Sequence, residues 1–155
     1  IEYGAYSCTA FRAFHRSGAI QQLQQEYGDQ INIVFRDYPV ISPRYDRMSA
    51  NIAQCALDQG NDLFWAYHDM LYNAPLAPPL SQNELVELGG NLGLDVEQLG
   101  DCASSETHVR TVQYDQNRAQ DLGLRSTPSF VVNGEVIMGG SIARIRSAIN
   151  NALSS

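Results

Sequence analysis

The sequence predicts an α/β fold in which a βαβ unit and a ββα unit flank a block of helices. Three observations carry this prediction. A helical pattern over residues 9–27 is followed by a β-rich run from Ile31 to Phe35, which indicates two parallel strands joined by a helix. Apolar residues then recur at helical spacing for about eighty residues. Near the C-terminus, Asn133-Gly134 separates two short apolar runs and predicts a β-hairpin.

The βαβ unit is predicted to begin with a short strand at residues 1–5. The helix at 9–27 ends at Gly28, and its candidate core positions are Phe11, Phe14, Ile20 and Leu23. The second strand, at 31–35, is ended by Tyr38-Pro39.

The central block is predicted to hold several helices. One repeats apolar side chains at Leu63, Phe64, Tyr67, Met70 and Leu71, and the next does so at Leu85, Leu88 and Leu92. A Ser81-x-x-Glu84 capping box opens the second of these helices, after Pro75, Pro78 and Pro79. A further helix is expected from about Ser105 to Leu122, with Val109, Val112, Ala119 and Leu122 on one face.

The ββα unit closes the chain. Asn133-Gly134 suits a two-residue type I′ turn because both positions need a positive φ, and a last helix is expected from Ser141 to about Leu153. We therefore expect a single domain over residues 1–155, with a helical insertion at about 44–104 or extending to 122.

Composition narrows the possible partners. The net charge of -7 leaves no basic stripe for nucleic acid or an anionic membrane, so neither is expected. No apolar run is long enough to span a bilayer. The chain begins at Ile1 inside a predicted strand, without a signal peptide, which fits either a removed leader or membrane anchor or an excised domain.

The three cysteines divide into two and one. Cys55 and Cys102 lie in helical segments, where they form either a disulfide or two buried thiols. Cys8 stands at a strand-to-helix junction. There, unpaired amide N–H groups and the positive helix end favour a reactive thiolate, although a cysteine at a helix start can also merely fill space.

Six segments together carry a family resemblance. They are Glu2-Tyr3 before Cys8, Arg12-Ala13-Phe14-His15, Phe35-Arg36-Asp37-Tyr38-Pro39, Phe64-Trp65 with His68-Asp69, Leu92-Gly93-Leu94-Asp95, and Leu122-Gly123 with the run from Ser126 to Gly134. This set resembles the DsbA-like family of extracytoplasmic thiol-disulfide oxidoreductases. The resemblance implies a thioredoxin-like fold with an inserted all-helical subdomain.

The resemblance also implies site residues. Cys8 is the expected nucleophile at the start of the active-site turn, which continues with Thr9, Ala10 and Phe11. Thr127-Pro128 is expected to be cis, with the proline ring against the reactive sulfur. Glu2 corresponds to a buried acidic group below the site, although a surface carboxylate at a strand edge is the alternative. Cys55 and Cys102 are expected to form a structural disulfide.

Phe11 stands where the family has its second cysteine, and its ring is expected to point into the core. A single thiolate can form a mixed disulfide but cannot complete an internal one. We therefore expect a DsbA-like oxidoreductase that forms mixed disulfides through Cys8 with protein or peptide thiols. This interpretation requires a sulfur that is open to solvent and lies within a few ångströms of the Pro128 ring.

Two other functions fit the same residues. One is a non-catalytic peptide-binding module, and the other is a glutathione-dependent transferase or isomerase of the related kappa-like branch. His15, His68 and His108 show no metal-ligand spacing, and His68 is expected to be a packed, hydrogen-bonded residue, so neither a metal nor a cofactor is expected. The resemblance implies an extracytoplasmic location, in the bacterial periplasm or at the outside of the cell envelope, and a redox partner of unknown identity.

Overall fold

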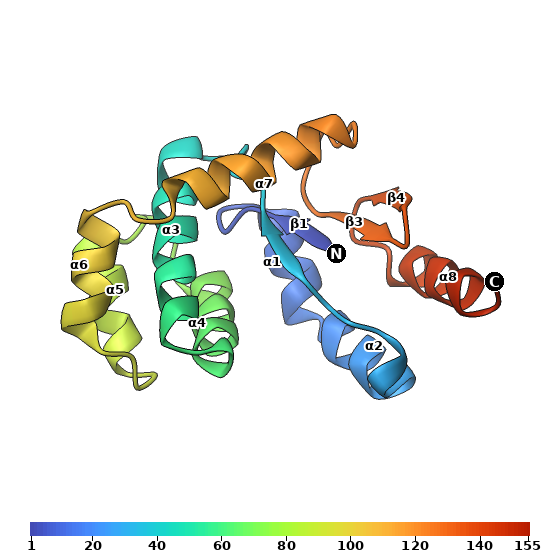
Figure 1. Cartoon of the computed structure of the whole chain (residues 1–155), viewed down its shortest axis with the longest axis horizontal. Helices are drawn as coiled ribbons and strands as arrows, with labels where there is room; N and C mark the ends of the chain where they lie inside the picture. Colours follow the sequence, from blue (N-terminus) through green and yellow to red (C-terminus); the bar gives the residue numbers. More distant parts are fainter.

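A four-stranded sheet is the centre of the protein, for which a computed structural model describes residues 1–155 (Figure 1). Its strands, in the order β2-β1-β3-β4, are β1 (Glu2–Gly4), β2 (Phe35–Asp37), β3 (Ser129–Val132) and β4 (Glu135–Met138). β1 pairs parallel with β2, while β3 runs antiparallel to both β1 and β4. The βαβ and ββα units therefore meet where β1 pairs with β3, and β1 is a central strand.

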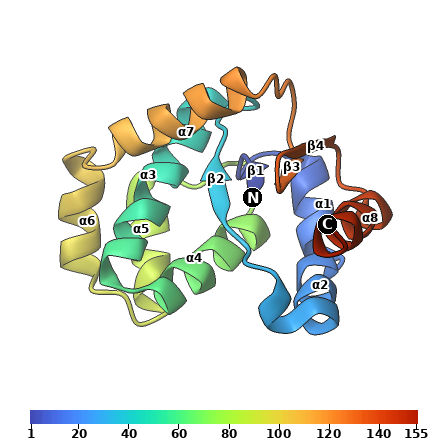
Figure 2. The same ribbon diagram turned by 45° about the vertical axis from the view of Figure 1, so that its right-hand side comes forward.

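Eight α-helices surround this sheet. They are α1 (Thr9–Arg16), α2 (Ala19–Tyr27), α3 (Pro43–Gln59), α4 (Asn61–Asn73), α5 (Gln82–Gly90), α6 (Val96–Ser104), α7 (Val109–Asp121) and α8 (Ile142–Leu153), and a 3-10 turn spans Gly28–Gln30. Helices α3 to α6 gather to one side of the sheet, and α7 runs from this block back over β2 (Figures 1 and 2). The expected thioredoxin-like fold with inserted helices is confirmed.

The single helix predicted at residues 9–27 is wrong, because the chain breaks between α1 and α2. Ser17 caps the end of α1 and its hydroxyl donates to the Phe14 carbonyl. Gly18 follows with φ 73°, a left-handed conformation that glycine adopts without a Cβ clash. Beyond the break, Leu23 is buried as expected, Ile20 is partly buried, and Gly28 ends α2.

The second strand begins later than predicted. Its pairing starts where Glu2 lies opposite Phe35, and the last contact before it is the Glu2 N–H bonded to the Val34 carbonyl. Residues 31–33 have no strand partner in β1, and a strand is defined by its pairing. Local β propensity alone therefore placed the strand too early.

The predicted turns and helix caps agree with the structure better than the predicted bounds of the helices and strands do. Asn133 and Gly134 have φ values of 44° and 95°, which confirms the tight hairpin turn. Ser81 and Glu84 form the predicted reciprocal capping box, and Ser141 caps α8. One helix start is wrong: α7 begins at Val109 instead of near residue 105, and the Val109 side chain is exposed instead of buried.

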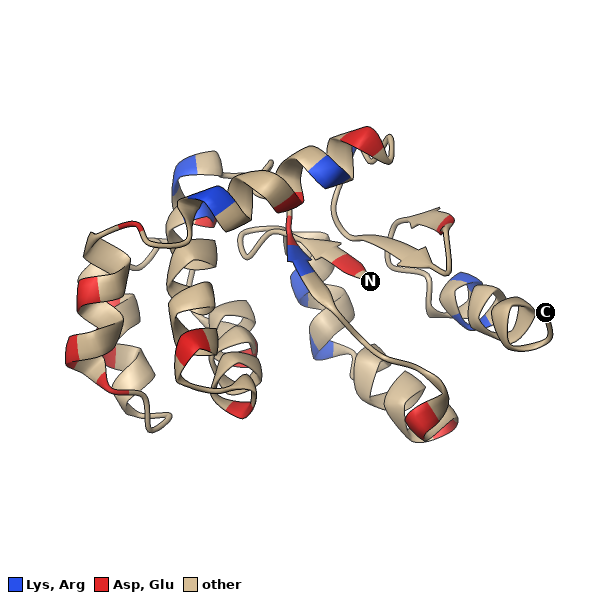
Figure 3. Cartoon of the chain, viewed as in Figure 1, with Lys and Arg blue, Asp and Glu red and all other residues tan.

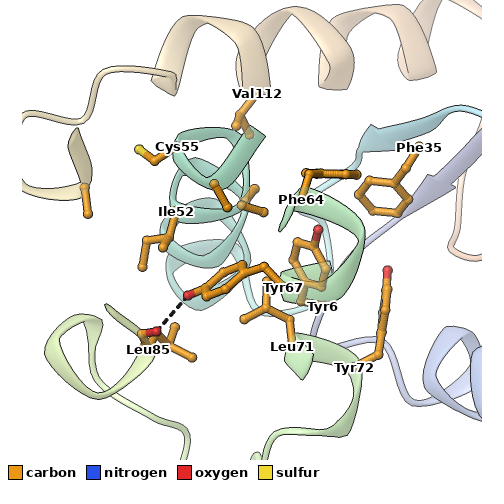
Figure 4. Close-up of a cluster of buried hydrophobic side chains, with 14 of the residues drawn as sticks. Tyr6, Phe35, Ile52, Cys55, Phe64, Tyr67, Leu71, Tyr72, Leu85 and Val112 are labelled. Atoms are coloured by element: carbon orange, nitrogen blue, oxygen red, sulfur yellow. Dashed lines mark hydrogen bonds between the residues drawn. The ribbon is translucent and has the colours of Figure 1, made fainter. Parts of the chain in front are cut away.

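The largest hydrophobic core joins the helical block to the segment between β1 and α1 and to the start of α1. It contains side chains from α3 to α6 together with Tyr6, Cys8 and Phe11. In Figure 4, the Tyr67 hydroxyl reaches from α4 to the Leu85 carbonyl on α5, at 2.9 Å. Two smaller cores cover the sheet, one under α1, α2 and α8 and the other under α7.

Charge is unevenly distributed over these layers. All ten basic residues are arginines, and none lies between Arg47 and Arg110. The helical block is therefore acidic, with carboxylates spread over α4, α5 and α6 (Figure 3). No helix of the protein has the length and apolar character needed to cross a membrane.

Candidate active site

Cys8 occupies the N-cap position of α1. Its backbone is extended there, with φ -70° and ψ 111°, while its carbonyl already accepts the Arg12 N–H. The sulfur accepts the Phe11 N–H at 3.4 Å, so it takes the role that a serine or aspartate oxygen has at other helix starts. The thiol is thereby held at the positive end of the α1 dipole.

Thr127 and Pro128 face this thiol from the loop before β3. The Thr127–Pro128 peptide bond is cis, and the Cys8 thiol donates to the Thr127 carbonyl oxygen at 3.2 Å. The Pro128 carbonyl accepts the Gly139 N–H at 2.9 Å, which ties the loop to the end of β4. The structure thus brings the expected nucleophile against the expected proline loop, 119 residues away along the chain.

Exposure is where the candidate site departs from expectation. Cys8 is only 4% exposed, and it belongs to the main hydrophobic core. The requirement for a sulfur that is open to solvent is therefore not met in this conformation. Thr9 and Ala10, the next two residues of the turn, are exposed.

Phe11 lies in α1, three residues after the N-cap Cys8. Its ring is fully buried, as predicted, and packs against the rings of Phe14, Phe35, Tyr72 and Phe130. A buried aromatic side chain, and no second thiol, therefore lies one helical turn after Cys8.

The two other cysteines are bonded to each other, away from Cys8. Cys55 on α3 and Cys102 on α6 are joined by a disulfide, which closes a loop with a sequence separation of 47 residues. Cys8 is the one free cysteine of the chain. With this bridge in place, no second thiol of the chain is available to resolve a mixed disulfide on Cys8.

Glu2 is buried in the central strand β1 and is only 4% exposed, which excludes the strand-edge alternative. It lies opposite Phe130, so its side chain shares the sheet face that α1, α2 and α8 cover. Burial raises the pKa of Glu2 to about 8, against a smaller opposing effect of the nearby amino group of Ile1. The carboxyl group is therefore largely protonated at neutral pH.

Arg12 and Asp46 are functional neighbours that sequence reasoning missed. The buried guanidinium of Arg12 donates to the carbonyls of Tyr6, Leu71 and Ala74, which fixes the start of α1 to the end of α4. Asp46 accepts the N–H of Ser7 at 2.9 Å through one oxygen. A basic residue four positions after Cys8 was a visible signal for Arg12, but nothing in the sequence indicated Asp46.

The histidines are arranged differently from the sequence expectation. His108 pairs only with Asp58, at 2.6 Å, beside the disulfide. His68 is packed and hydrogen-bonded, as predicted, and burial lowers its pKa to about 3, which keeps the ring neutral. His15, His68 and Asp69, however, lie close together, with one potential ligand atom of each within 4.8 Å of the others, which their spacing in the sequence did not reveal.

Fold and site together define a thioredoxin-like protein with a DsbA-type helical insertion, in which an N-cap cysteine faces a cis-proline loop. A family model described as thioredoxin matches residues 1–151, and the chain belongs to the thioredoxin family.

Two curated relatives match most of the chain. The chain is 29% identical over 152 residues to the Na(+)/H(+) antiporter NhaA of Herminiimonas arsenicoxydans, covering 98% of this chain and 23% of the antiporter. It is 27% identical over 145 residues to "Probable disulfide bond formation protein D" of Bacillus anthracis, covering 88% of this chain and 65% of that protein. The chain thus spans less than two thirds of either curated relative.

Among solved structures, oxidised BdbD from Bacillus subtilis superposes with a TM-score of 0.84. The sequence identity is 21%, and the superposition covers 99% of this chain and 86% of that one. This similarity confirms the resemblance to the DsbA-like family at the level of the fold.

Proposed function

We propose that this protein is a DsbA-like thiol-disulfide oxidoreductase that reacts through Cys8 alone. The observation that carries the proposal is the contact between the Cys8 sulfur and the Thr127 carbonyl, beside the cis bond to Pro128. The similarity to a relative named for disulfide bond formation agrees with it. The chain matches only 23% of the antiporter, so we propose no transport activity for it.

The chemistry is one thiol-disulfide exchange followed by release. The Cys8 thiolate attacks one sulfur of a substrate disulfide, a new bond joins Cys8 to that sulfur, and the other sulfur leaves as a thiolate. A second thiol, from the substrate or from solution, then attacks the mixed disulfide and frees Cys8. One disulfide is consumed and one is formed, so the protein itself undergoes no net oxidation.

The burial of Cys8 adds a conformational step to this scheme. At 4% exposure, the sulfur meets a substrate only after the turn at Thr9 and Ala10 separates from the Thr127 loop. This opening breaks the 3.2 Å contact with the Thr127 carbonyl. We propose that an extended peptide then takes the place of the thiol along this loop.

Protein or peptide thiols and disulfides are the proposed substrates, and an extracytoplasmic compartment is the proposed location. The Cys55–Cys102 disulfide supports the location, because disulfides persist in oxidising compartments. The proposed redox partner is an external thiol, which releases Cys8 from a mixed disulfide, or an external disulfide, which forms a mixed disulfide with Cys8.

The rate at which Cys8 is labelled tests the proposal. Native protein should react with a thiol-specific reagent at pH near 6 faster than a peptide thiol does, and Cys8→Ser should not react. A peptide that carries a disulfide should also be captured, with release of one of its sulfurs as a thiolate, as a covalent adduct that disappears on reduction. Labelling no faster than a free peptide thiol would remove the oxidoreductase proposal.

A second candidate is a non-catalytic peptide-binding module. Two observations favour it, namely the 4% exposure of Cys8 and the replacement of a second thiol by Phe11. Under this alternative, peptide binding at the Thr127 loop survives Cys8→Ser unchanged. Under the oxidoreductase proposal, the same substitution abolishes covalent capture.

A further inference from the structure

Two histidines and an aspartate come together where α1 packs against α4. His15 Nε2 on α1 lies 2.9 Å from Asp69 Oδ1 on α4, and His68 is the neighbour of Asp69 on the same helix. One ligand atom of each of the three residues lies within 4.8 Å of the other two. Small adjustments of these side chains would place all three around one ion.

The His68 ring is arranged as metal-bound imidazoles usually are. Its Nδ1 is hydrogen-bonded to the Tyr6 hydroxyl at 3.0 Å, and the residue is only 2% exposed. No protein group bonds its Nε2, and in the tautomer whose Nδ1–H donates to Tyr6 the lone pair of Nε2 is free to bind an ion. A ligating histidine typically has its other ring nitrogen held by a second partner in this way, which fixes the ring orientation.

A small cavity of about 120 Å³ adjoins these residues. His15, His68, Asp69 and Glu2 contribute to its lining, together with Trp65. The Glu2 carboxyl group is 4% exposed and has no hydrogen-bond partner among the side chains and backbone of the protein. The cavity is therefore lined by two imidazole rings and two carboxyl groups.

We propose that His15, His68 and Asp69 form a binding site for one divalent first-row transition metal ion, Zn²⁺ by its ligand chemistry. Two imidazole nitrogens and a carboxylate suit Zn²⁺, whereas Ca²⁺ and Mg²⁺ prefer sites made of oxygen atoms. The ion would replace the direct contact between His15 and Asp69 and would bind the free His68 Nε2.

An ion bound at this site would link two parts of the fold. His15 belongs to the helix that begins at Cys8, while His68 and Asp69 belong to the helical block. An ion that binds only this folded arrangement stabilises it in proportion to its concentration. No electron transfer is involved, and the site does not use the Cys8 thiol.

Calorimetric titration of the oxidised full chain with Zn²⁺ tests the proposal. We expect one Zn²⁺ per chain, and a thermal midpoint that rises with Zn²⁺ concentration. His15→Gln and Asp69→Asn should each weaken binding by at least about 10-fold, and Tyr6→Phe should weaken it by roughly 10- to 100-fold, as loss of an outer partner does. Co²⁺ bound in place of Zn²⁺ should give visible absorption bands that His15→Gln abolishes.

Two controls separate this site from other binding. His108→Gln removes another histidine-carboxylate pair, one that has no second imidazole beside it, and it should leave the affinity unchanged. Cys8→Ser should also bind normally, so the result does not depend on the proposed redox function. Equal affinity in all variants, loss of binding in Cys8→Ser, or no binding by the native chain would each overturn the proposal.

Discussion

The ring of Phe11 stacks on the ring of Tyr72, with centroids 4.9 Å apart and planes within 7° of each other. Phe11 comes from the helix of the candidate nucleophile and Tyr72 from the inserted helices. The stacked rings therefore link these two parts of the protein and should contribute to its stability. Under the proposed function, the same residue also excludes a dithiol reaction.

Phe11→Cys should restore a dithiol reaction at the cost of stability. The new thiol would lie one helical turn from Cys8, so the pair could form an internal disulfide and pass it to a substrate. Removing a buried ring should lower the free energy of unfolding by about 3 kcal/mol or more, as other large-to-small core substitutions do. Insulin reduction and urea unfolding measure the two effects.

Phe11→Ala is the matched control for this substitution. It opens a comparable cavity without adding a thiol, so it should be similarly destabilised and remain inactive in dithiol exchange. If Phe11→Cys is folded and as inactive as Phe11→Ala, then the scaffold does not support disulfide exchange, and the proposed function loses its structural basis.

Arg12→Met should destabilise the protein strongly, and Arg16→Met should not. Arg12 is buried and satisfies three backbone carbonyls that would be left without a partner. Each orphaned buried acceptor costs roughly 1–3 kcal/mol, so we expect a loss of at least about 2 kcal/mol. Arg16 is exposed and bonds the Tyr72 carbonyl and an Asn73 side chain, so its loss should cost less than about 1 kcal/mol.

Urea unfolding of both arginine variants at one pH measures this difference. Similar losses for the two substitutions would show that Arg12 contributes through its aliphatic packing alone, and not through the three carbonyls.

Features that depend on residues close together in the sequence could be predicted, whereas features that depend on distant residues could not. The turn at Asn133-Gly134 and the Ser81 cap depend on residues within four positions, and both were found. The burial of Cys8 depends on a loop 119 residues away. The approach of His15 to His68 depends on how α1 packs on α4, so neither feature could be deduced from local patterns.

The break at Gly18 is an intermediate case. A glycine inside a helical pattern is compatible with a continuous helix at a cost of about 1 kcal/mol, so the pattern favoured one helix. Packing decided otherwise, because Phe14 and Leu23 both contact the α8 side of the sheet from two separate helices.

Removing the Cys55–Cys102 disulfide should lower the free energy of unfolding by about 4 kcal/mol, the value that the chain-entropy model assigns to a loop of this length. The double substitution Cys55→Ser with Cys102→Ser should therefore unfold at lower urea concentration, and a reducing agent should no longer change its midpoint. Cys8→Ser is the control, and its midpoint should still fall on reduction. If native protein unfolds identically with and without reductant, then the bridge contributes nothing to stability.

Asp37 should make stability depend on pH in a direction opposite to that of most carboxylates. The side chain is 2% exposed, and burial raises its pKa to about 7, while a hydrogen bond from Gln54 at 2.9 Å and the charge of Arg36 act the other way. Between the unfolded value of 3.8 and about 7, the folded state keeps a proton that the unfolded state has lost. Stability therefore falls as pH rises through this range, by up to about 1.4 kcal/mol per pH unit.

Asp37→Asn isolates this effect, because the native pH profile also contains an opposing one. Burial lowers the pKa of His68 to about 3, so its contribution to stability increases with pH up to its ordinary value of 6.5. The raised pKa of Glu2 acts in the same direction as that of Asp37, so the native profile sums several contributions. Only the contribution of Asp37 is absent from Asp37→Asn. The stability of Asp37→Asn relative to native protein should therefore increase from about pH 4 to about pH 7 and then level off, as measured by urea unfolding.

Gln54→Met provides the second variant for this test. It removes the hydrogen bond that favours the ionised form of Asp37, so the fall in stability should continue to higher pH than in native protein. Parallel pH profiles for native protein and Asp37→Asn would mean that Asp37 titrates alike in the folded and unfolded states. The buried carboxyl would then have to be solvated in the folded protein, contrary to its 2% exposure.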